Sequence, residues 1–397
     1  MKDGWKMKKL GEVCLFENGD RGENYPSKSV QTTSGVPFIN AGHLTDFGID
    51  YQTLNFIPRE RFDLLGNGKI RKNDILFCLR GSLGKFACVG KLSEGAIASS
   101  LVIVRPCKSV LKSYVLAYFQ SDLCAEMISK FKNGAAQPNL SAGNLKEFKI
   151  PLPALPEQQR IVAILDEAFE GIATAKANAD KNLKNARQLF ESHLNSVFSQ
   201  RGEGWVEKRL GQVCQTGAGG TPLKSKKAYY EGGTIPWLLS GEVSQGQIHK
   251  AKHFISQQGL ENSSAKIFPK NTVLVAMYGA TAGQVGILKF EASTNQAVCG
   301  ILPNDRFVPE YLFYFFLSQK DSLVAQAAGN AQPNISQLKI KNTAVPILSL
   351  SEQQEIVERF DFLRNQTQRL ESIYQKKIEA LDALKKSILQ KAFSGKM

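Results

Sequence analysis

The sequence predicts an α+β fold: two similar globular units, each a mixed β-sheet with helices, separated by two long helices that pair antiparallel along a coiled-coil-like seam. Two observations predict it. The chain repeats itself once, and each copy changes abruptly from a strand-and-loop pattern to an uninterrupted helical pattern. A chain of 397 residues also exceeds the usual size of a single hydrophobic core. We therefore divide it into globular residues 1–156, a helix at 157–203, globular residues 204–351 and a helix at 352–397.

The repeat is visible at both ends of each globular unit. Gly4-Trp5 returns 200 positions later as Gly204-Trp205. Residues 134–141, GAAQPNLS, return 195 positions later as residues 329–336, GNAQPNIS. Because small changes of offset are typical of insertions in surface loops, two copies of one unit account for nearly the whole chain.

Each copy changes character at a Glu-Gln-Gln triplet. Before it, short β-rich runs such as residues 74–79 alternate with Gly and Pro, which is typical of strands joined by loops. After it, apolar residues recur at 4-3 spacing, which predicts a long helix whose apolar seam needs a partner helix. Ser351 and Gln354 have the spacing of a capping box, and Pro156 suits a first helical turn. The seam positions are Ile161, Leu165, Ala168, Ile172, Ala175 and Ala179, then Ile356, Phe360, Leu363, Thr367, Leu370 and Tyr374.

The short connection at residues 201–204 favours antiparallel packing of the two helices. In that arrangement two equivalent helices are related by a pseudo-two-fold axis, and the globular units lie at opposite ends of the pair.

The positive charge is concentrated in the globular units. The chain has a formal charge of +14 and a pI near 9.3. Residues 1–156 carry 21 basic and 14 acidic side chains and residues 204–351 carry 14 and 8, whereas the two helical segments together are +1. Two related basic modules favour a polyanionic partner, and double-stranded DNA with two half-sites suits them.

The sequence lacks the common motifs of catalysis. Residues 80–86, RGSLGKF, fail the phosphate-binding-loop pattern, and neither an Asn/Asp-Pro-Pro-aromatic tetrad nor a nucleophile elbow is present. His249 and His253 are spaced to chelate a metal on a helix, but Lys250 and Lys252 disfavour a cation there, and a solvated or phosphate-facing surface is the alternative. We therefore expect no enzymatic activity, no cofactor and no metal.

The seven cysteines and the apolar runs bear on the location of the protein. The cysteines are odd in number and contain no Cys-x-x-Cys pair, so we expect reduced core thiols. The longest apolar run, Tyr311 to Leu317, is too short to cross a bilayer, and we expect a cytoplasmic protein without membrane contact.

Together these motifs resemble the specificity subunits of type I restriction-modification systems. The resemblance is carried by residues 5–10 and 205–210, by the repeated Gln-Pro-Asn-apolar-Ser turn, and by residues 150–161, IPLPALPEQQRI, with their second copy at 345–356. It implies two target recognition domains that read an asymmetric, bipartite DNA sequence. It also implies that the helices act as spacer and docking site for two modification (methyltransferase) subunits and for restriction/translocase subunits. The modification subunits supply S-adenosylmethionine and adenine methylation in such systems.

Candidate DNA contacts are polar residues that flank predicted strand ends. They are Arg21, Lys28, Asn40, His43, Arg80, Ser82 and Lys85 in the first unit, and Lys224, Lys226, Lys227, Ser240, Glu242, Tyr278, Thr281 and Gln284 in the second.

Two repeated motifs leave alternatives open. Gln137 and Asn139, with Gln332 and Asn334, either contact DNA through their amides or stabilise a rigid turn. The triplets at the helix starts either contact a partner subunit or compensate the helix dipole; their residues are Glu157, Gln158, Gln159, Glu352, Gln353 and Gln354. A scaffold without DNA binding, or an autonomous DNA methyltransferase or nuclease, are the rival functions.

Overall fold

The structure is a computed structural model that describes residues 3–46, 48–134, 138–200, 205–327 and 334–397. The chain divides into two compact units, which are described separately. Unit 1 comprises residues 1–179 and 376–397, and unit 2 comprises residues 180–375.

The described residues of unit 1 form three sheets: a ribbon of β1 and β9, a four-stranded sheet in the order β2-β8-β5-β6, and a small sheet in the order β4-β3-β7. Its strands are β1 (Lys6–Lys9), β2 (Cys14–Asn18), β3 (Val36–Ile39), β4 (Asn55–Ile57), β5 (Ile75–Cys78), β6 (Phe86–Cys88), β7 (Ala96–Ile97), β8 (Leu101–Pro106) and β9 (Lys149–Leu152). Its shorter helices and 3-10 turns are α1 (Leu10–Val13), η1 (Lys28–Val30), η2 (Ala41–His43), α2 (Arg59–Asp63), α3 (Lys112–Phe119), α4 (Asp122–Phe131) and α5 (Ala142–Lys146).

Unit 2 repeats this plan with two additional short strands. A ribbon of β10 and β20 accompanies a sheet in the order β11-β19-β16-β17-β13 and a small sheet in the order β14-β12-β18-β15. The strands are β10 (Val206–Arg209), β11 (Thr216–Ala218), β12 (Ile235–Leu238), β13 (Gln247–Ile248), β14 (His253–Ile255), β15 (Ile267–Phe268), β16 (Val273–Ala276), β17 (Val285–Leu288), β18 (Ala292–Thr294), β19 (Val298–Ile301) and β20 (Ala344–Ile347). The shorter helices and turns are α7 (Leu210–Val213), η3 (Lys227–Tyr229), η4 (Ser240–Gln245), α8 (Gln257–Glu261), η5 (Gly279–Thr281), α9 (Pro309–Ser318), α10 (Lys320–Ala325) and α11 (Gln337–Asn342).

The central strand of each unit is buried on both faces, which explains why its sequence is continuously apolar. All four residues of β5 are buried, with Ile75 and Phe77 in one hydrophobic core and Leu76 and Cys78 in another. Since successive side chains of a strand point to opposite faces, a strand covered on both sides has no polar position. β16 is buried in the same way.

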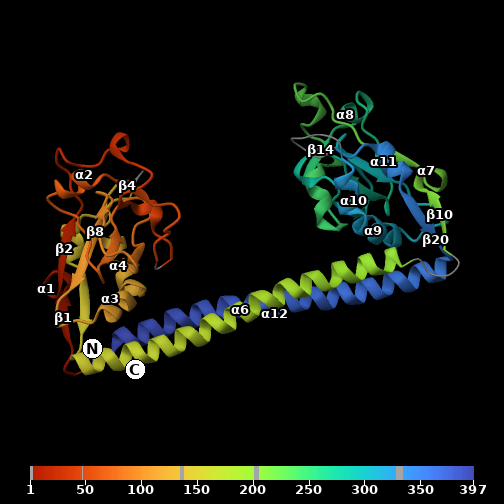
Figure 1. Cartoon of the computed structure of the whole chain (residues 1–397). Helices are drawn as coiled ribbons and strands as arrows, with labels where there is room; N and C mark the ends of the chain where they lie inside the picture. Colours follow the sequence, from red (N-terminus) through yellow and green to blue (C-terminus); the bar gives the residue numbers. More distant parts are fainter. Residues whose placement is uncertain (1–2, 47, 135–137, 201–204, 328–333) are drawn as a thin grey trace. The chain divides into compact units, whose positions relative to one another are not determined.

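The two long helices are α6 (Leu155–Ser199) and α12 (Leu350–Ser394), each of 45 residues. They run side by side and antiparallel within each unit (Figure 1). In unit 1 the Lys176 ammonium lies 2.7 Å from the Asp382 carboxylate, and in unit 2 Arg187 lies 3.0 Å from Glu371. The predicted antiparallel pairing is therefore confirmed within each unit.

The predicted seam agrees with the burial pattern except at one position. Ile161, Leu165 and Phe360 are each 1% exposed, but Leu370 is 38% exposed. A pattern with a 3.5-residue period drifts around a helix of 3.6 residues per turn, so a seam read over several turns loses its register at some positions.

The start of α12 corrects the predicted cap. The reciprocal hydrogen bonds join Ser349 and Glu352, each two residues before the predicted partners Ser351 and Gln354. The Ser349 backbone N–H donates to the Glu352 carboxylate at 2.9 Å, and the Glu352 N–H donates to Ser349 Oγ at 3.3 Å. Ser351 lies inside the first helical turn, because the intrahelical hydrogen bonds begin at the Ser349 carbonyl, which accepts from the Gln353 N–H, and a cap residue lies just before the helix.

Candidate nucleic-acid interface

The repeated Asn-apolar-Ser segment forms the same local structure in both units. Leu140 is buried and its N–H donates to the Leu79 carbonyl, while Ser141 Oγ caps α5 by accepting from the Asn144 N–H at 2.9 Å. Ile335 is likewise buried and Ser336 caps α11. The segment thus attaches a short helix to the end of the central strand, which supports its structural role.

The asparagine of this segment lies beside the loop that follows the central strand. Asn139 forms an isolated bridge with Arg80, and Asn334 forms the equivalent bridge with Tyr278. All four residues are exposed. The repeat therefore places Arg80 in unit 1 where it places Tyr278 in unit 2, two side chains of different chemistry on one scaffold. Gln137 and Gln332 lie outside the described residues.

The candidate contacts in the first unit differ in accessibility. Arg21, Lys28, Arg80 and Ser82 are exposed. Asn40 and Lys85 are half-buried and His43 is buried, and all three have hydrogen-bond partners within the unit.

Lys85 donates its ammonium to the Leu44 carbonyl at 3.2 Å, which joins the loop after β5 to the end of η2. Asn40 Oδ1 accepts from the Gly42 N–H at 2.8 Å, and His43 Nδ1 accepts from the Asn40 N–H at 3.1 Å. His43 is 6% exposed, and this burial lowers the pKa of its imidazole despite the nearby Asp50 carboxylate. We therefore expect His43 to shape the turn rather than contact DNA directly.

The second unit shows the same division. Lys224, Lys226, Lys227 and Tyr278 are exposed, and Ser240, Thr281 and Gln284 are half-buried. Lys226 donates to the Tyr229 hydroxyl at 3.2 Å and lies 5.2 Å from the centre of that ring. The 3-10 turns η4 and η5 pack on each other, which brings the segments of Ser240 and Thr281 together.

Glu242 has the same internal role as His43. It is 5% exposed, and its carboxylate accepts from the backbone N–H groups of Leu239 and Lys252, both at 3.0 Å. Both oxygens are therefore occupied, and burial leaves Glu242 no surface for a base. Because the local pattern shows only that these residues follow a strand, sequence reasoning did not separate internal caps from exposed contacts.

The Glu-Gln-Gln triplets also divide into internal and exposed positions. Gln158 and Gln353 are fully buried. The Gln158 amide accepts from the Leu111 N–H at 2.9 Å and donates to the carbonyls of Pro153 and Ser109 at 2.9 and 3.1 Å. Gln353 makes the equivalent three hydrogen bonds, to Val308, Leu348 and Arg306. These glutamines hold each helix start on its own unit and have no surface for a partner.

The outer residues of the triplets face solvent. Gln159, Glu352 and Gln354 are exposed, while Glu157 is half-buried and pairs with Arg160 at 2.7 Å. Hydrogen bonds from the Ser349 side chain and backbone lower the pKa of Glu352, which keeps a negative charge at the positive end of the helix dipole.

A basic, aromatic recess in unit 2 was missed in the sequence. Lys224 and Tyr230 come from one loop, whereas Lys252, His253 and Phe254 come from β14 and the residue before it, and the recess between them has a volume of about 620 Å³. The signal that could have indicated it is an aromatic residue among cations at 250–254, KAKHF.

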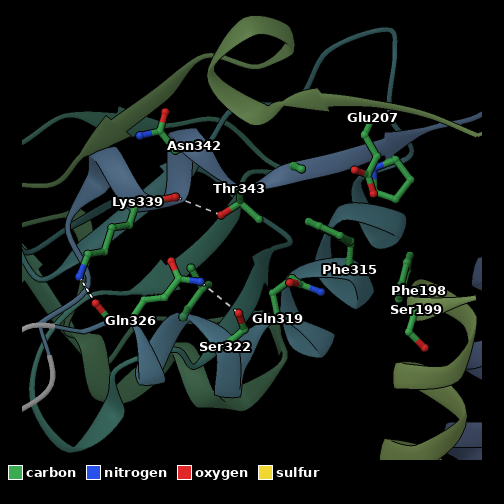
Figure 2. Close-up of a pocket in the computed structure, with 13 residues that line it drawn as sticks. Phe198, Ser199, Glu207, Phe315, Gln319, Ser322, Gln326, Lys339, Asn342 and Thr343 are labelled. Carbon is green, nitrogen blue, oxygen red and sulfur yellow. Dashed lines mark hydrogen bonds between the residues drawn. The ribbon is translucent and has the colours of Figure 1, made fainter. Parts of the chain in front are cut away.

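The polar groove drawn in Figure 2 lies in unit 2 beside the β10/β20 ribbon and has a volume of about 510 Å³. The Lys339 ammonium points to the Gln326 carbonyl, and Gln326 donates to Ser322 Oγ at 3.1 Å. Glu207 lies across the groove from Lys339. Since no nucleophile, base and orienting group meet among these lining residues, the groove offers no recognisable acyl- or phosphoryl-transfer chemistry.

The described ranges contain neither a metal-binding cluster nor a membrane-spanning helix. There, no group of three or more His, Cys, Asp and Glu side chains is placed to hold a metal ion. Within the same ranges no helix is both long and apolar enough to span a bilayer. All seven cysteines are free thiols, five of them buried, and burial raises the pKa of Cys14 to about 12. The apolar run at Tyr311–Leu317 is the buried helix α9.

The sequence model of the family described as "Type I restriction modification DNA specificity domain" matches residues 2–184 and again residues 202–380. The chain belongs to this family. The two matches of the specificity domain account for the internal repeat, and the described helices and sheets agree with the α+β class that the sequence predicts.

The chain is also similar to individual proteins described as type I restriction enzyme specificity subunits. The chain is 27% identical over 68% of its length to the EcoR124I/EcoR124II specificity subunit of Escherichia coli, of which 69% is covered. It is 24% identical over its full length to the putative MjaX specificity subunit of Methanocaldococcus jannaschii, of which 94% is covered.

Solved structures support the fold. A chain from a structural study of complex assembly and conformational transition of the type I R-M system matches with a TM-score of 0.82 and 21% identity, covering 99% of this chain and 98% of that one. The HsdS subunit of Thermoanaerobacter tengcongensis matches with a TM-score of 0.63 and 20% identity, covering 100% and 98%.

Proposed function

We propose that this specificity-family chain reads an asymmetric, bipartite sequence in double-stranded DNA, one half with each globular unit. Residues 1–156 and 204–351 are the recognition domains in this proposal, and the helical segments 157–203 and 352–397 set the spacing. The chain itself is non-catalytic. Two modification subunits, together with restriction/translocase subunits, supply methylation, translocation and cleavage.

One observation carries the proposal: the two units repeat a scaffold but differ at its exposed polar positions. Arg80 and Tyr278 occupy equivalent bridges beside the same asparagine, and both are exposed. An arginine can bind the guanine edge with two hydrogen bonds, which a tyrosine cannot do. A duplicated scaffold with different surface chemistry is suited to two different half-sites.

The location of charge favours DNA over a purely protein-binding scaffold. The basic excess lies in the two globular segments, whereas the helical segments are nearly neutral. Binding to duplex phosphates releases counterions, so affinity falls steeply with salt concentration.

The test is to measure duplex binding by the purified chain across salt concentrations and to map methylated adenines in cells that express the whole complex. The proposal expects a steep salt dependence and a split motif whose two halves differ. Salt-insensitive or absent duplex binding would instead support the scaffold function. Binding of S-adenosylmethionine or turnover by chain freed of its partners would support an enzyme.

A further inference from the structure

The basic, aromatic recess of unit 2 has a rigid floor. Trp237 is 5% exposed and its indole N–H donates to the Gly220 carbonyl at 2.9 Å. The Tyr230 ring meets it edge to face, with 6.0 Å between the ring centres and 70° between the ring planes. A Cβ on Gly233 would lie 2.6 Å from the Ile255 carbonyl carbon, so only glycine lets this loop lie against β14.

The rim of the recess combines an exposed aromatic ring with cations. Phe254 is 44% exposed on β14, which is an edge strand of the small sheet. Lys252 and His253 precede it, and both side chains are exposed. Within the described part of the chain, neither side chain has a hydrogen-bond or ion-pair partner. An apolar ring beside an unpaired ammonium and an unpaired imidazole suits DNA, whose phosphates are anionic and whose bases present apolar groups such as the thymine methyl.

Unit 1 has the same strand register at this edge, although Asn55 and Phe56 are half-buried there and Phe56 also bridges Thr32. In unit 2 His253 pairs with Trp237 and Phe254 with Pro236. In unit 1 Asn55 pairs with Phe38 and Phe56 with Pro37, again on the edge strand of the small sheet.

Unit 1 has similar supporting contacts, with its glycine one register position later than that of unit 2. Tyr25 meets Phe38 edge to face with 6.0 Å between ring centres, and a Cβ on Gly35 would lie 2.6 Å from the Ile57 carbonyl oxygen. Asn55 and His253 therefore occupy one structural position in two copies of one scaffold.

At this shared position the two units carry different side chains, as a protein that reads two different half-sites requires. The phenylalanine that follows is the same in both units, as a contact with any half-site would allow. Asparagine can donate and accept together at an adenine edge, whereas an imidazole presents its donor and acceptor on opposite sides of a ring. The two side chains therefore favour different base edges.

We propose that the edge strands β4 and β14 contact DNA in the two units, and that Asn55 and His253 are the matched specificity-determining residues, each for its own half-site. Phe56 and Phe254 supply an apolar contact to the bases, and Lys224 and Lys252 bind backbone phosphates at the unit 2 recess. This inference rests on the proposed function and names part of its binding surface.

The experiment exchanges the two side chains. N55H and H253N are each expressed with the modification subunits, and the methylated motif is mapped and then checked by binding to duplexes varied at each position. We expect each exchange to change base preference in one half of the motif by roughly 5- to 150-fold and to leave the other half unaltered. H249N is the matched control, because His249 is an exposed histidine four residues away that does not line the recess.

Lys252→Ala tests the phosphate contact separately. It should weaken all duplexes alike and reduce the slope of log affinity against log salt by about one. An unaltered motif in both exchanged variants would overturn the inference, as would an equal loss in both halves. If the unmodified chain shows no salt-dependent duplex binding, the proposed function fails, which is a distinguishable result.

Discussion

At the scale of single residues, the repeated motifs are mostly occupied with their own fold. Gln158 and Gln353 satisfy one backbone N–H and two carbonyls each, where the first helical turn meets its globular unit. His43 and Glu242 satisfy the backbone of equivalent 3-10 turns. A polar residue that is buried for such a purpose cannot reach DNA, so specificity belongs to exposed positions at which the units differ.

Gln158→Ala should destabilise unit 1. The substitution leaves the Leu111 N–H and the carbonyls of Ser109 and Pro153 without their amide partner, and a buried unsatisfied group costs about 1 to 3 kcal/mol. Gln159→Ala, at the exposed neighbour, should stay within about 0.5 kcal/mol. Urea unfolding of the two variants measures the difference, and equal midpoints would contradict the internal role of Gln158.

Unit 1 also contains an ion network, and the two equivalent positions described in unit 2 carry uncharged residues. The Arg105 guanidinium binds Glu17 and Asp74, and Glu17 further accepts from the Gly68 N–H at 2.8 Å. Burial by itself raises the pKa of Glu17, but Arg105 and the backbone donors outweigh it and hold the pKa below the ordinary value of 4.5. The strand register places Gly217 and Leu302 of unit 2 where unit 1 has Glu17 and Arg105.

Stability of unit 1 should therefore depend on acid through Glu17. A lowered native pKa means that the carboxylate stabilises the fold above the unfolded value and that this contribution is lost as pH falls through the native value. Glu17→Gln should destabilise the protein at pH 7, and the gap to the unmodified chain should close as pH falls below about 4. Denaturation across pH measures this, with the exposed Glu60→Gln as control. A gap that is constant with pH would refute the role of the charge.

At the scale of elements, the sequence predicted the features that depend on patterns along the chain and missed those that depend on contacts between distant segments. The repeat, the helices and the buried central strands follow from periodicity along the chain, and they are confirmed. The cap of α12 was displaced because Ser349 with Glu352 and Ser351 with Gln354 have the same spacing, and only the backbone decides which pair forms. The recess was missed because it joins Lys224 to Lys252 and Phe254 through strand pairing, which local patterns do not reveal.

Ser349→Ala should loosen the first turn of α12. The hydroxyl accepts from the Glu352 N–H, and loss of such a cap costs about 1 kcal/mol. Ser351→Ala is the matched control, because Ser351 is exposed inside the helix. Hydrogen exchange of the first helical amides should accelerate only in the Ser349 variant. Acceleration in Ser351→Ala alone would place the cap at Ser351. Equal acceleration in both variants would contradict a cap formed by Ser349 alone.

At the scale of the whole molecule, both long helices contribute to each of the two compact units. The N-terminal part of α6 and the C-terminal part of α12 belong to unit 1, and the remaining halves belong to unit 2. The ion pairs Lys176–Asp382 and Arg187–Glu371 show that α6 and α12 pack antiparallel in both units. A helical pair of this kind suits a spacer, because its length is set by residue number and its near-zero charge gives it no strong attraction to DNA.

The spacer role predicts the effect of a matched insertion. Seven residues added to α6 within 177–186 and seven added to α12 within 372–381 leave both ion pairs on their own units and keep the seam in a 3.5-residue register. At 1.5 Å per residue the insertions lengthen the pair by about 10 Å, or roughly three base pairs at 3.4 Å each. The methylated motif of cells carrying this variant should then keep the bases of both halves and gain a longer gap between them. Five-residue insertions at the same places break the seam register and should cost folding. An unaltered gap, or a changed base in either half, would show that the helices do not set the spacing.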